Sequence, residues 1–291
     1  MSGRCNVDLN EIVVISGKGG TGKTTLVASM IPFFENVIVG DCDVDAPDLD
    51  ILFEKTLDEN REFVGTKKAV IDEDKCIHCG KCYESCKFNA ITEDIKMKTS
   101  KCEGCGVCEF VCPVDAIKMV DGVVGNLFVS TTKYGKIVHA RLIPGEETSG
   151  KLVSEVRKVA KEFAKNENIQ NMLVDGSPGV ACNVISSMTG AKKVVIVTEP
   201  TLSGLHDLIR VYEVTQKFRL PVTVVVNKYN LSENMTRKIE EFCNEKGIEL
   251  GLKIPFDKKM VEAIVKKEIP SLYNKELFEK IGFFEFIKKL K

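Results

Sequence analysis

The sequence predicts an α/β protein with a doubly wound, mostly parallel sheet and a small inserted α+β domain. Short apolar segments alternate with longer helical patterns over most of the 291 residues, which is the arrangement expected of βαβ units. Between about residue 66 and residue 120 this alternation stops, and the chain becomes rich in cysteine and charge. We therefore expect residues 1–65 and 121–291 to form one domain and residues 66–120 to form the inserted one.

The expected elements follow one another in the order that a parallel sheet requires. A buried strand at residues 11–16 enters a glycine-rich loop, and the helix at 24–31 ends near Pro32. The later strands are expected at 36–40, 170–174, 193–198 and 221–226, and the later helices at 151–165, 202–217 and 232–245. Residues 277–291 carry apolar residues with lysines between them, and we expect this C-terminal helix to pack back on the sheet.

Size and charge exclude several classes of protein. The chain is 44% hydrophobic, which is enough to bury a sizeable core. Its formal net charge of -1 creates no field that would attract nucleic acid or acidic lipid. No apolar run approaches the roughly 20 residues that a membrane span needs, and the start of the chain has no signal-peptide pattern. We expect a cytoplasmic protein that binds neither nucleic acid nor membrane.

The glycine-rich loop has the spacing of a phosphate-binding loop. It reads Gly17-Lys18-Gly19-Gly20-Thr21-Gly22-Lys23-Thr24-Thr25 and lies between an expected strand and an expected helix. In such a loop, backbone N–H groups surround the phosphates, the second lysine reaches the β- and γ-phosphates, and the following threonine binds Mg²⁺. The sequence therefore predicts an ATP site in which Lys23 and Thr24 hold these positions.

Eight of the twelve cysteines fall into two runs inside the inserted segment. The runs are Cys76-x2-Cys79-x2-Cys82-x3-Cys86 and Cys102-x2-Cys105-x2-Cys108-x3-Cys112. This spacing favours metal ligation over disulfides. Zinc is one candidate for four-cysteine sites, but the doubled rhythm resembles the two-cluster bacterial ferredoxins.

In those ferredoxins the fourth cysteine of each run ligates the other cluster. The resemblance thus implies two [4Fe–4S] clusters. One would be held by Cys76, Cys79, Cys82 and Cys112, and the other by Cys102, Cys105, Cys108 and Cys86.

The nucleotide-binding part resembles the superfamily of MinD, ParA and the nitrogenase iron protein. Three features carry the resemblance: the extra lysine, Lys18, which makes the loop a deviant Walker A motif; the Asp41-Cys42-Asp43 segment; and the LVDGSPG segment at 173–179. The resemblance implies that Lys18 reaches the ATP of a second subunit. A solvated surface lysine and ordinary acidic or strand-end turns are the alternatives, especially for Asp45 and Asp48.

The same resemblance assigns roles to single residues. Asp41 would hold Mg²⁺ through water, Asp43 would orient the attacking water, and Asp175 would join the Mg²⁺ shell. Gly179 would lie near the γ-phosphate. Asn227 would bind the adenine amino group, and Pro255 and Asp257 belong to a loop that would close over the base. Hydrolysis would then depend on Lys18, Lys23 and Asp43.

Together these features predict an ATPase that dimerises with ATP, as a homodimer or with a paralogue. We expect its nucleotide state to control electron transfer or cluster delivery to an unidentified redox or cluster-acceptor protein. The alternative is a positioning or scaffolding switch of the MinD or ParA kind, with structural or redox-sensing clusters. In MinD the C-terminal helix binds membrane, so residues 277–291 have that alternative too.

Three residues carry smaller expectations. Cys182 matches in position a cluster ligand of the nitrogenase iron protein. The second cysteine that such a bridging cluster needs, near residues 147–151, is absent, so we expect Cys182 to be a small buried residue. His78 is expected on a surface loop. Lys87 stands where the second run has Pro113, and a cation there would raise the potential of the nearer cluster.

Overall fold

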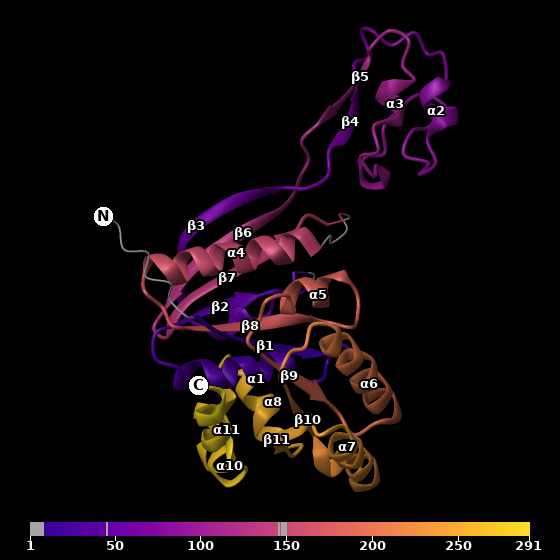
Figure 1. The fold of residues 1–291 in the computed structure, drawn as a ribbon. Coiled ribbons are helices and arrows are strands. Elements are labelled where there is room, and N and C mark those ends of the chain that lie inside the picture. Colours follow the sequence, from indigo (N-terminus) through magenta and orange to yellow (C-terminus); the bar gives the residue numbers. More distant parts are fainter. Residues whose placement is uncertain (1–8, 45, 145, 147–149) are drawn as a thin grey trace. The chain divides into compact units, whose positions relative to one another are not determined.

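The computed structural model describes residues 9–44, 46–144, 146 and 150–291. Its main feature is a nine-stranded sheet with the order β11-β10-β9-β1-β8-β2-β7-β6-β3 (Figure 1). The chain divides into two compact units. One comprises Met1–Asn60, Leu127–Arg141 and Thr148–Lys291, and the other comprises Arg61–Asn126 and Leu142–Glu147. The predicted fold class, an α/β sheet with a small insertion, is confirmed.

The centre of the sheet is parallel and fully buried. In β1 (Asn10–Ser16), every residue after the first is buried. The strand pairs in parallel with β8 (Asn171–Pro178) on one side and with β9 (Lys193–Thr198) on the other. Runs of valine and isoleucine of this kind are typical of strands that are covered on both faces. The other parallel strands are β2 (Val37–Asp41), β10 (Val222–Asn227) and β11 (Glu249–Ile254).

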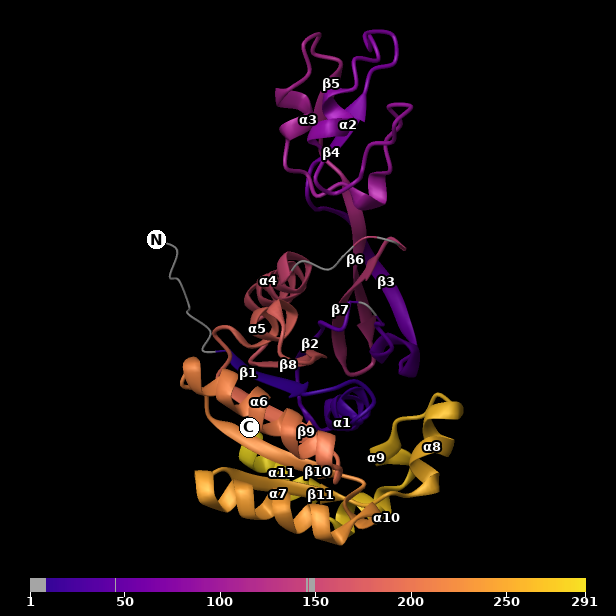
Figure 2. The same cartoon turned by 90° about the vertical axis from the view of Figure 1, so that its right-hand side faces the viewer.

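Helices cover both faces of this sheet. One face packs on α1 (Lys23–Met30) and on the C-terminal helices, whose apolar side chains share one core with Ile12, Val14 and Val195. On the opposite side of the strands lie α4 (Gly150–Asn166) and α5 (Cys182–Met188), as Figure 1 shows. The remaining helices of this unit are α6 (Leu202–Lys217), α7 (Glu233–Lys246), α8 (Lys258–Val265) and α9 (Pro270–Tyr273), seen from the side in Figure 2.

Besides β11, the sheet contains three more strands that the sequence did not predict. They are β3 (Lys55–Val64), β6 (Val123–Thr132) and β7 (Gly135–Leu142). A two-residue turn joins β6 to β7, and β7 pairs in parallel with β2. Gly135 has φ +145, and a Cβ there would lie 2.0 Å from the carbonyl oxygen of Val37, so only glycine fits where the hairpin meets β2.

The inserted unit has its own small sheet. Its strands β4 (Lys68–Ile71) and β5 (Ile117–Val120) pair antiparallel. Two short helices, α2 (Lys81–Ser85) and α3 (Val107–Phe110), carry the third cysteine of each run, Cys82 and Cys108.

The C-terminal segment packs on the protein, as predicted, but it forms two helices and not one. These are α10 (Lys275–Lys280) and α11 (Phe283–Leu290), and they are separated because Gly282 takes φ +75, a conformation that ends a helix. The apolar side chains of α11 (Phe283, Phe286, Ile287 and Leu290) are all buried. The helix therefore presents no free apolar face of the kind that a membrane-surface helix needs. Among the described residues no helix is long and apolar enough to cross a membrane.

Phe283 provides a test of this packing. Its ring is fully buried and lies edge-on to Phe278, with ring centroids 4.8 Å apart, and to Phe33. We expect Phe283→Ala to lower the free energy of unfolding by about 3–5 kcal/mol, because a large cavity would remain in the core. The measurement is the urea midpoint followed by far-UV circular dichroism. Phe218→Ala, at a ring that is 38% exposed, is the control, and equal midpoints for both variants would contradict the assignment.

Candidate functional sites

The phosphate loop follows β1 at the edge of the sheet where the carboxyl ends of the parallel strands meet. Ser16 ends β1, Asp41 ends β2, and Asp175 lies in β8, directly opposite Asp41 in the strand register. Helix α1 begins at Lys23, and Gly22 caps it with φ +90. A Cβ at Gly22 would lie 2.3 Å from the side-chain nitrogen of Asn227, so the loop can fold this tightly only with glycine.

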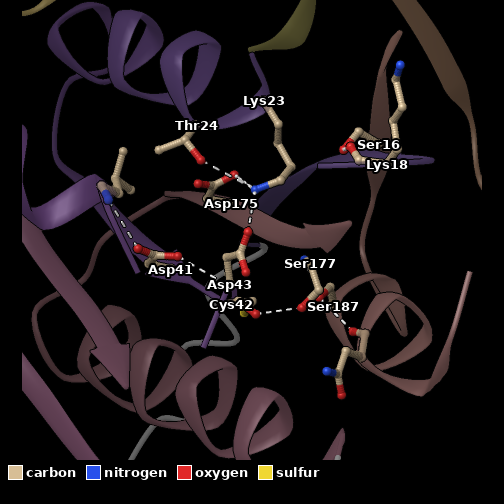
Figure 3. A network of polar contacts seen from close by, with 12 residues as sticks. Ser16, Lys18, Lys23, Thr24, Asp41, Cys42, Asp43, Asp175, Ser177 and Ser187 are labelled. Atoms are coloured by element: carbon tan, nitrogen blue, oxygen red, sulfur yellow. Dashed lines mark hydrogen bonds and ion pairs between the residues drawn. The ribbon is translucent and has the colours of Figure 1, made fainter. Parts of the chain in front are cut away.

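Lys23 is the centre of a buried polar network (Figure 3). Its ammonium lies 2.7 Å from Asp175 Oδ1, 3.4 Å from Thr24 Oγ1 and 3.6 Å from Asp43 Oδ2. Only 5% of the residue is exposed. Burial lowers the pKa of Lys23, but the charge and the hydrogen bond of Asp175, followed by the charges of Asp43 and Asp41, raise it by more. Lys23 is therefore held as a cation where the phosphates of a nucleotide would lie.

The carboxylates of Asp41 and Asp175 are both fully buried. Asp41 accepts hydrogen bonds from the backbone N–H groups of Asp43 (3.1 Å) and Leu49 (3.4 Å). Burial, and next the charge of Asp175, raise the pKa of Asp41 well above its usual range. The second carboxylate oxygen of Asp175, Oδ2, is buried and has no hydrogen-bond partner. A buried oxygen without a partner is costly, so this pair of acids is suited to a cation.

The donor set fits Mg²⁺ in particular. Magnesium is usually held by one or two carboxylates together with phosphate oxygens and waters, and here two carboxylates lie beside the Thr24 hydroxyl. Over the described ranges, no three His, Cys, Asp or Glu side chains come close enough to enclose a metal ion by themselves.

The segments that follow β2 and β8 are bonded to each other. The N–H of Cys42 donates to the carbonyl of Asp175 (2.8 Å), and the hydroxyl of Ser177 donates to the carbonyl of Cys42 (2.6 Å). The N–H of Gly179 donates to the carbonyl of Ser16, and Gly179 takes φ +98. Because of these hydrogen bonds, a displacement of one segment would also displace the other. Asp48 is exposed, and Asp45 lies outside the described residues.

Lys18 is arranged differently from Lys23. About one-third of its side chain is exposed, and its ammonium lies 3.5 Å from Glu199 Oε2 and 3.4 Å from the Ser203 hydroxyl. Figure 3 shows this ammonium turned away from Lys23 and from the carboxylates around it. Within one chain, Lys18 does not take part in the buried network.

The residues expected around the base also have partners inside the protein. Asn227 donates to the carbonyl of Thr21 (2.8 Å), so it supports the phosphate loop. Asp257 caps α8 by accepting from the N–H of Lys259 (2.8 Å), and Pro255 is half-buried three residues before that helix. The cap at Asp257 was not foreseen, although an aspartate directly before a helical pattern is a known sign of one.

In the inserted unit, the structure brings together the four cysteines of each predicted set. One small cavity is lined by Cys76, Cys79, Cys82 and Cys112, and a second is lined by Cys102, Cys105, Cys108 and Cys86. The unit's core contains Cys82 and Cys102 together with Ala69, Ala90, Ile91, Ile95 and Ile117. Cys76, Cys86, Cys108 and Cys112 pack against it, whereas Cys79 and Cys105 are exposed. So small an apolar core would gain much of its stability from bound metal clusters.

The internal repeat of the insert appears as an approximate two-fold arrangement. The pairing of Ile71 with Ile117 in one half corresponds to the bridge between Ile91 and Met97 in the other. Two backbone N–H groups donate to the sulfurs of the fourth cysteines in the same way, from Ala90 to Cys86 (3.4 Å) and from Ala116 to Cys112 (3.3 Å).

Cys182 corrects one expectation. The residue is exposed, not buried. It is the first residue of α5, which buries Val184, Ser187 and Met188 on one face, so residue 182 falls on the other face. His78 is exposed in a loop, as expected, and Lys87 is also exposed.

Comparison with known proteins places both parts of the chain. Residues 69–119 match the family described as a 4Fe-4S dicluster domain. Over 54 residues, 19% of this chain and 67% of the relative, the chain is 43% identical to the pyruvate synthase subunit PorD of Methanothermobacter marburgensis. The match to a dicluster family favours iron–sulfur clusters over zinc.

The whole chain has relatives in sequence and in structure. It is 32% identical to the uncharacterized protein MJ0578 of Methanocaldococcus jannaschii over 97% of this chain and 96% of that protein. It is 30% identical to MJ0579 of the same organism, over 90% of this chain and 92% of that protein. The MinD structure of Pyrococcus horikoshii, complexed with Mg-ADP, matches with a TM-score of 0.59, 17% identity and coverage of 97% and 96%. A ParA family ATPase of Chlorobium tepidum matches with a TM-score of 0.54 and 13% identity, over 97% of this chain and 98% of that chain.

The sheet, the phosphate loop and the matched insert define a protein with the MinD/ParA fold and an inserted 4Fe-4S dicluster domain. Within that class, the chain belongs to the family of MJ0578 and MJ0579.

The buried network predicts a strong effect of Lys23 on nucleotide binding. We expect Lys23→Ala to weaken ATP binding by about 3 kcal/mol, on the order of 100-fold in Kd, because the phosphates lose their buried cation. Isothermal titration calorimetry with ATP and Mg²⁺ measures this. Lys253→Ala, at a half-exposed lysine paired with Glu240, is the control. Unchanged affinity in a folded Lys23→Ala protein would contradict the assigned site.

Proposed function

We propose that the protein hydrolyses ATP as a dimer and uses the nucleotide state to control electron transfer, or cluster delivery, through its inserted dicluster domain. One observation carries the proposal: a single chain combines the buried Lys23, Asp41 and Asp175 network with two sets of four cysteines. We further propose that residues 66–120 act as the iron–sulfur domain. Strands β3 and β6 each cross the residue boundary between the two compact units, so the two units are joined by continuous chain segments.

At the nucleotide, most of the rate acceleration would come from position and charge. Lys23 would bind the β- and γ-phosphates from inside the loop. Thr24, Asp41 and Asp175 would hold Mg²⁺, which when bound would neutralise phosphate charge. Asp43, at 3.6 Å from the Lys23 ammonium and with 20% of its side chain exposed, is placed to orient a water that enters from solvent.

The site of one chain lacks one group that this chemistry needs. Lys18 points away from its own network, toward Glu199 and Ser203. We propose that Lys18 completes the site of a second subunit, either an identical chain or a paralogue. Hydrolysis would then require dimerisation, so ATP would act as a switch.

The insert supports a redox role for this switch. It is similar to PorD, a subunit of pyruvate synthase, and to subunit delta of an NADH-dependent phenylglyoxylate dehydrogenase. Two complete cysteine sets also exceed what a purely structural cluster would need. The partner would be a redox protein or a cluster acceptor.

A positioning switch is the second candidate. It is favoured by the match of almost the whole chain to MinD, a septum site-determining protein. In that function the clusters would serve as structure or as a redox sensor, and ATP would leave their potentials unchanged.

Lys18 tests the shared site. We expect Lys18→Ala to bind ATP with an affinity within about threefold of the parent, yet to lose ATP-dependent dimerisation and at least about tenfold in hydrolysis, because the lysine acts on the other subunit's phosphates. Sedimentation velocity and phosphate release measure these properties. Lys228→Ala is the matched control, since Lys228 also pairs with Glu199. Hydrolysis at the parent rate by Lys18→Ala would remove the shared-site argument.

Redox titration separates the two candidate functions. We expect the iron-replete protein to hold about eight irons per chain, four for each cluster, and to shift its reduction potentials when a non-hydrolysable ATP analogue and Mg²⁺ are added. Anaerobic titration followed by EPR measures both properties. Unchanged potentials, together with ATP-driven dimerisation, would instead support the positioning switch.

A further inference from the structure

A buried lysine lies beside one of the two cysteine sets. Lys68, at the start of β4, is only 8% exposed. Its ammonium donates to the carbonyl oxygens of Cys102 (3.1 Å) and Thr99 (3.4 Å) and forms an ion pair with Glu146 at 2.9 Å. All of these residues belong to the inserted unit. The Lys68 ammonium is thus hydrogen-bonded to the backbone carbonyl of Cys102, a residue predicted to ligate a cluster.

The other cysteine set has no such cation at the equivalent position. When the two halves of the internal repeat are aligned so that Cys76 corresponds to Cys102, Lys68 corresponds to Asp94. Asp94 is exposed and pairs with Lys96 at 3.3 Å, with 62% of its side chain in contact with solvent. The N–H to sulfur hydrogen bonds, by contrast, are alike in the two halves. The halves therefore differ in buried charge while they share backbone hydrogen bonding.

This difference acts on the reduction step. Each cluster would take up one electron from a low-potential donor, with no bond made or broken, and would become more negative by one charge. A nearby cation favours the more negative state, and a buried cation is screened far less than an exposed one. Lys87 follows Cys86 of the same set, but it is exposed, so Lys68 is the stronger influence.

We propose that Lys68 raises the reduction potential of the cluster held by Cys86, Cys102, Cys105 and Cys108 above that of the other cluster, and that Glu146 limits this rise. The first electron would then settle on the cluster beside Lys68. The inference rests on the two clusters of the proposed function, but it requires no effect of ATP.

The test is an anaerobic dithionite titration of the full, iron-replete chain without nucleotide, followed by EPR. We expect Lys68→Met to lower one of the two potentials and Glu146→Gln to raise the same one, while the second potential stays unchanged. Lys87→Met, at an exposed lysine close to the same cysteine set, is the matched control and should give a smaller shift. Hyperfine-shifted cysteine β-proton NMR signals should show that the set containing Cys102 is reduced first in the parent protein.

Several results would overturn the inference. These are no shift in either Lys68→Met or Glu146→Gln, equal shifts of both potentials, or shifts of the same sign in the two variants. Iron content per chain is measured alongside, because a merely structural role would change cluster retention and not produce potential shifts of opposite sign. If Lys68→Met does not retain its clusters, Glu146→Gln decides by its own shift. Too little iron in the parent would refute the proposed function itself, whereas full loading with unshifted potentials would refute only the role of Lys68.

Discussion

The buried contact between Lys23 and Asp175 is the constraint on which the nucleotide site depends. Placing these charges away from water is costly unless they are paired, and the strand register sets a second buried acid, Asp41, directly beside Asp175. One lysine cannot satisfy both carboxylates, as the unpartnered Oδ2 of Asp175 and the raised pKa of Asp41 show. A divalent cation would relieve this excess of negative charge, so these acids are suited to Mg²⁺ bound together with phosphate.

The sequence was most informative where structure is local. The strand at 193–198 and the helix at 202–217 were predicted to the residue. The structure adds that Thr201 caps this helix by accepting from the N–H of Gly204. Among the strands that were missed, β3 was missed for a physical reason. In β3 (KTLDENREFV) most side chains are exposed, so its sequence lacks the alternation of apolar and polar residues that predicts a strand. The exposed position of Cys182 was missed because burial depends on which face a helix turns to its neighbours.

The candidate sites could be predicted to a similar degree. The residues of the phosphate loop, Asp41 and Asp175 come together because the carboxyl ends of parallel strands meet at one edge of the sheet, a rule that the sequence pattern already implies. The pair formed by Lys68 and Glu146 could not be predicted in this way. The two residues are far apart in the sequence and carry no motif, and only the folded insert brings them to Cys102. Motifs thus indicate which groups perform the chemistry, but the charges that tune them depend on tertiary structure.

Coupling between the two sites would have to act in both directions. If ATP favours a state in which a cluster is more easily reduced, then reduction must tighten ATP binding by the same factor. For a one-electron step, a tenfold change in affinity corresponds to a potential shift of about 59 mV. A coupling of that size is smaller than the energy of one buried ion pair that loses its partner. A change at a single buried charge would therefore be large enough to account for a coupling of this size.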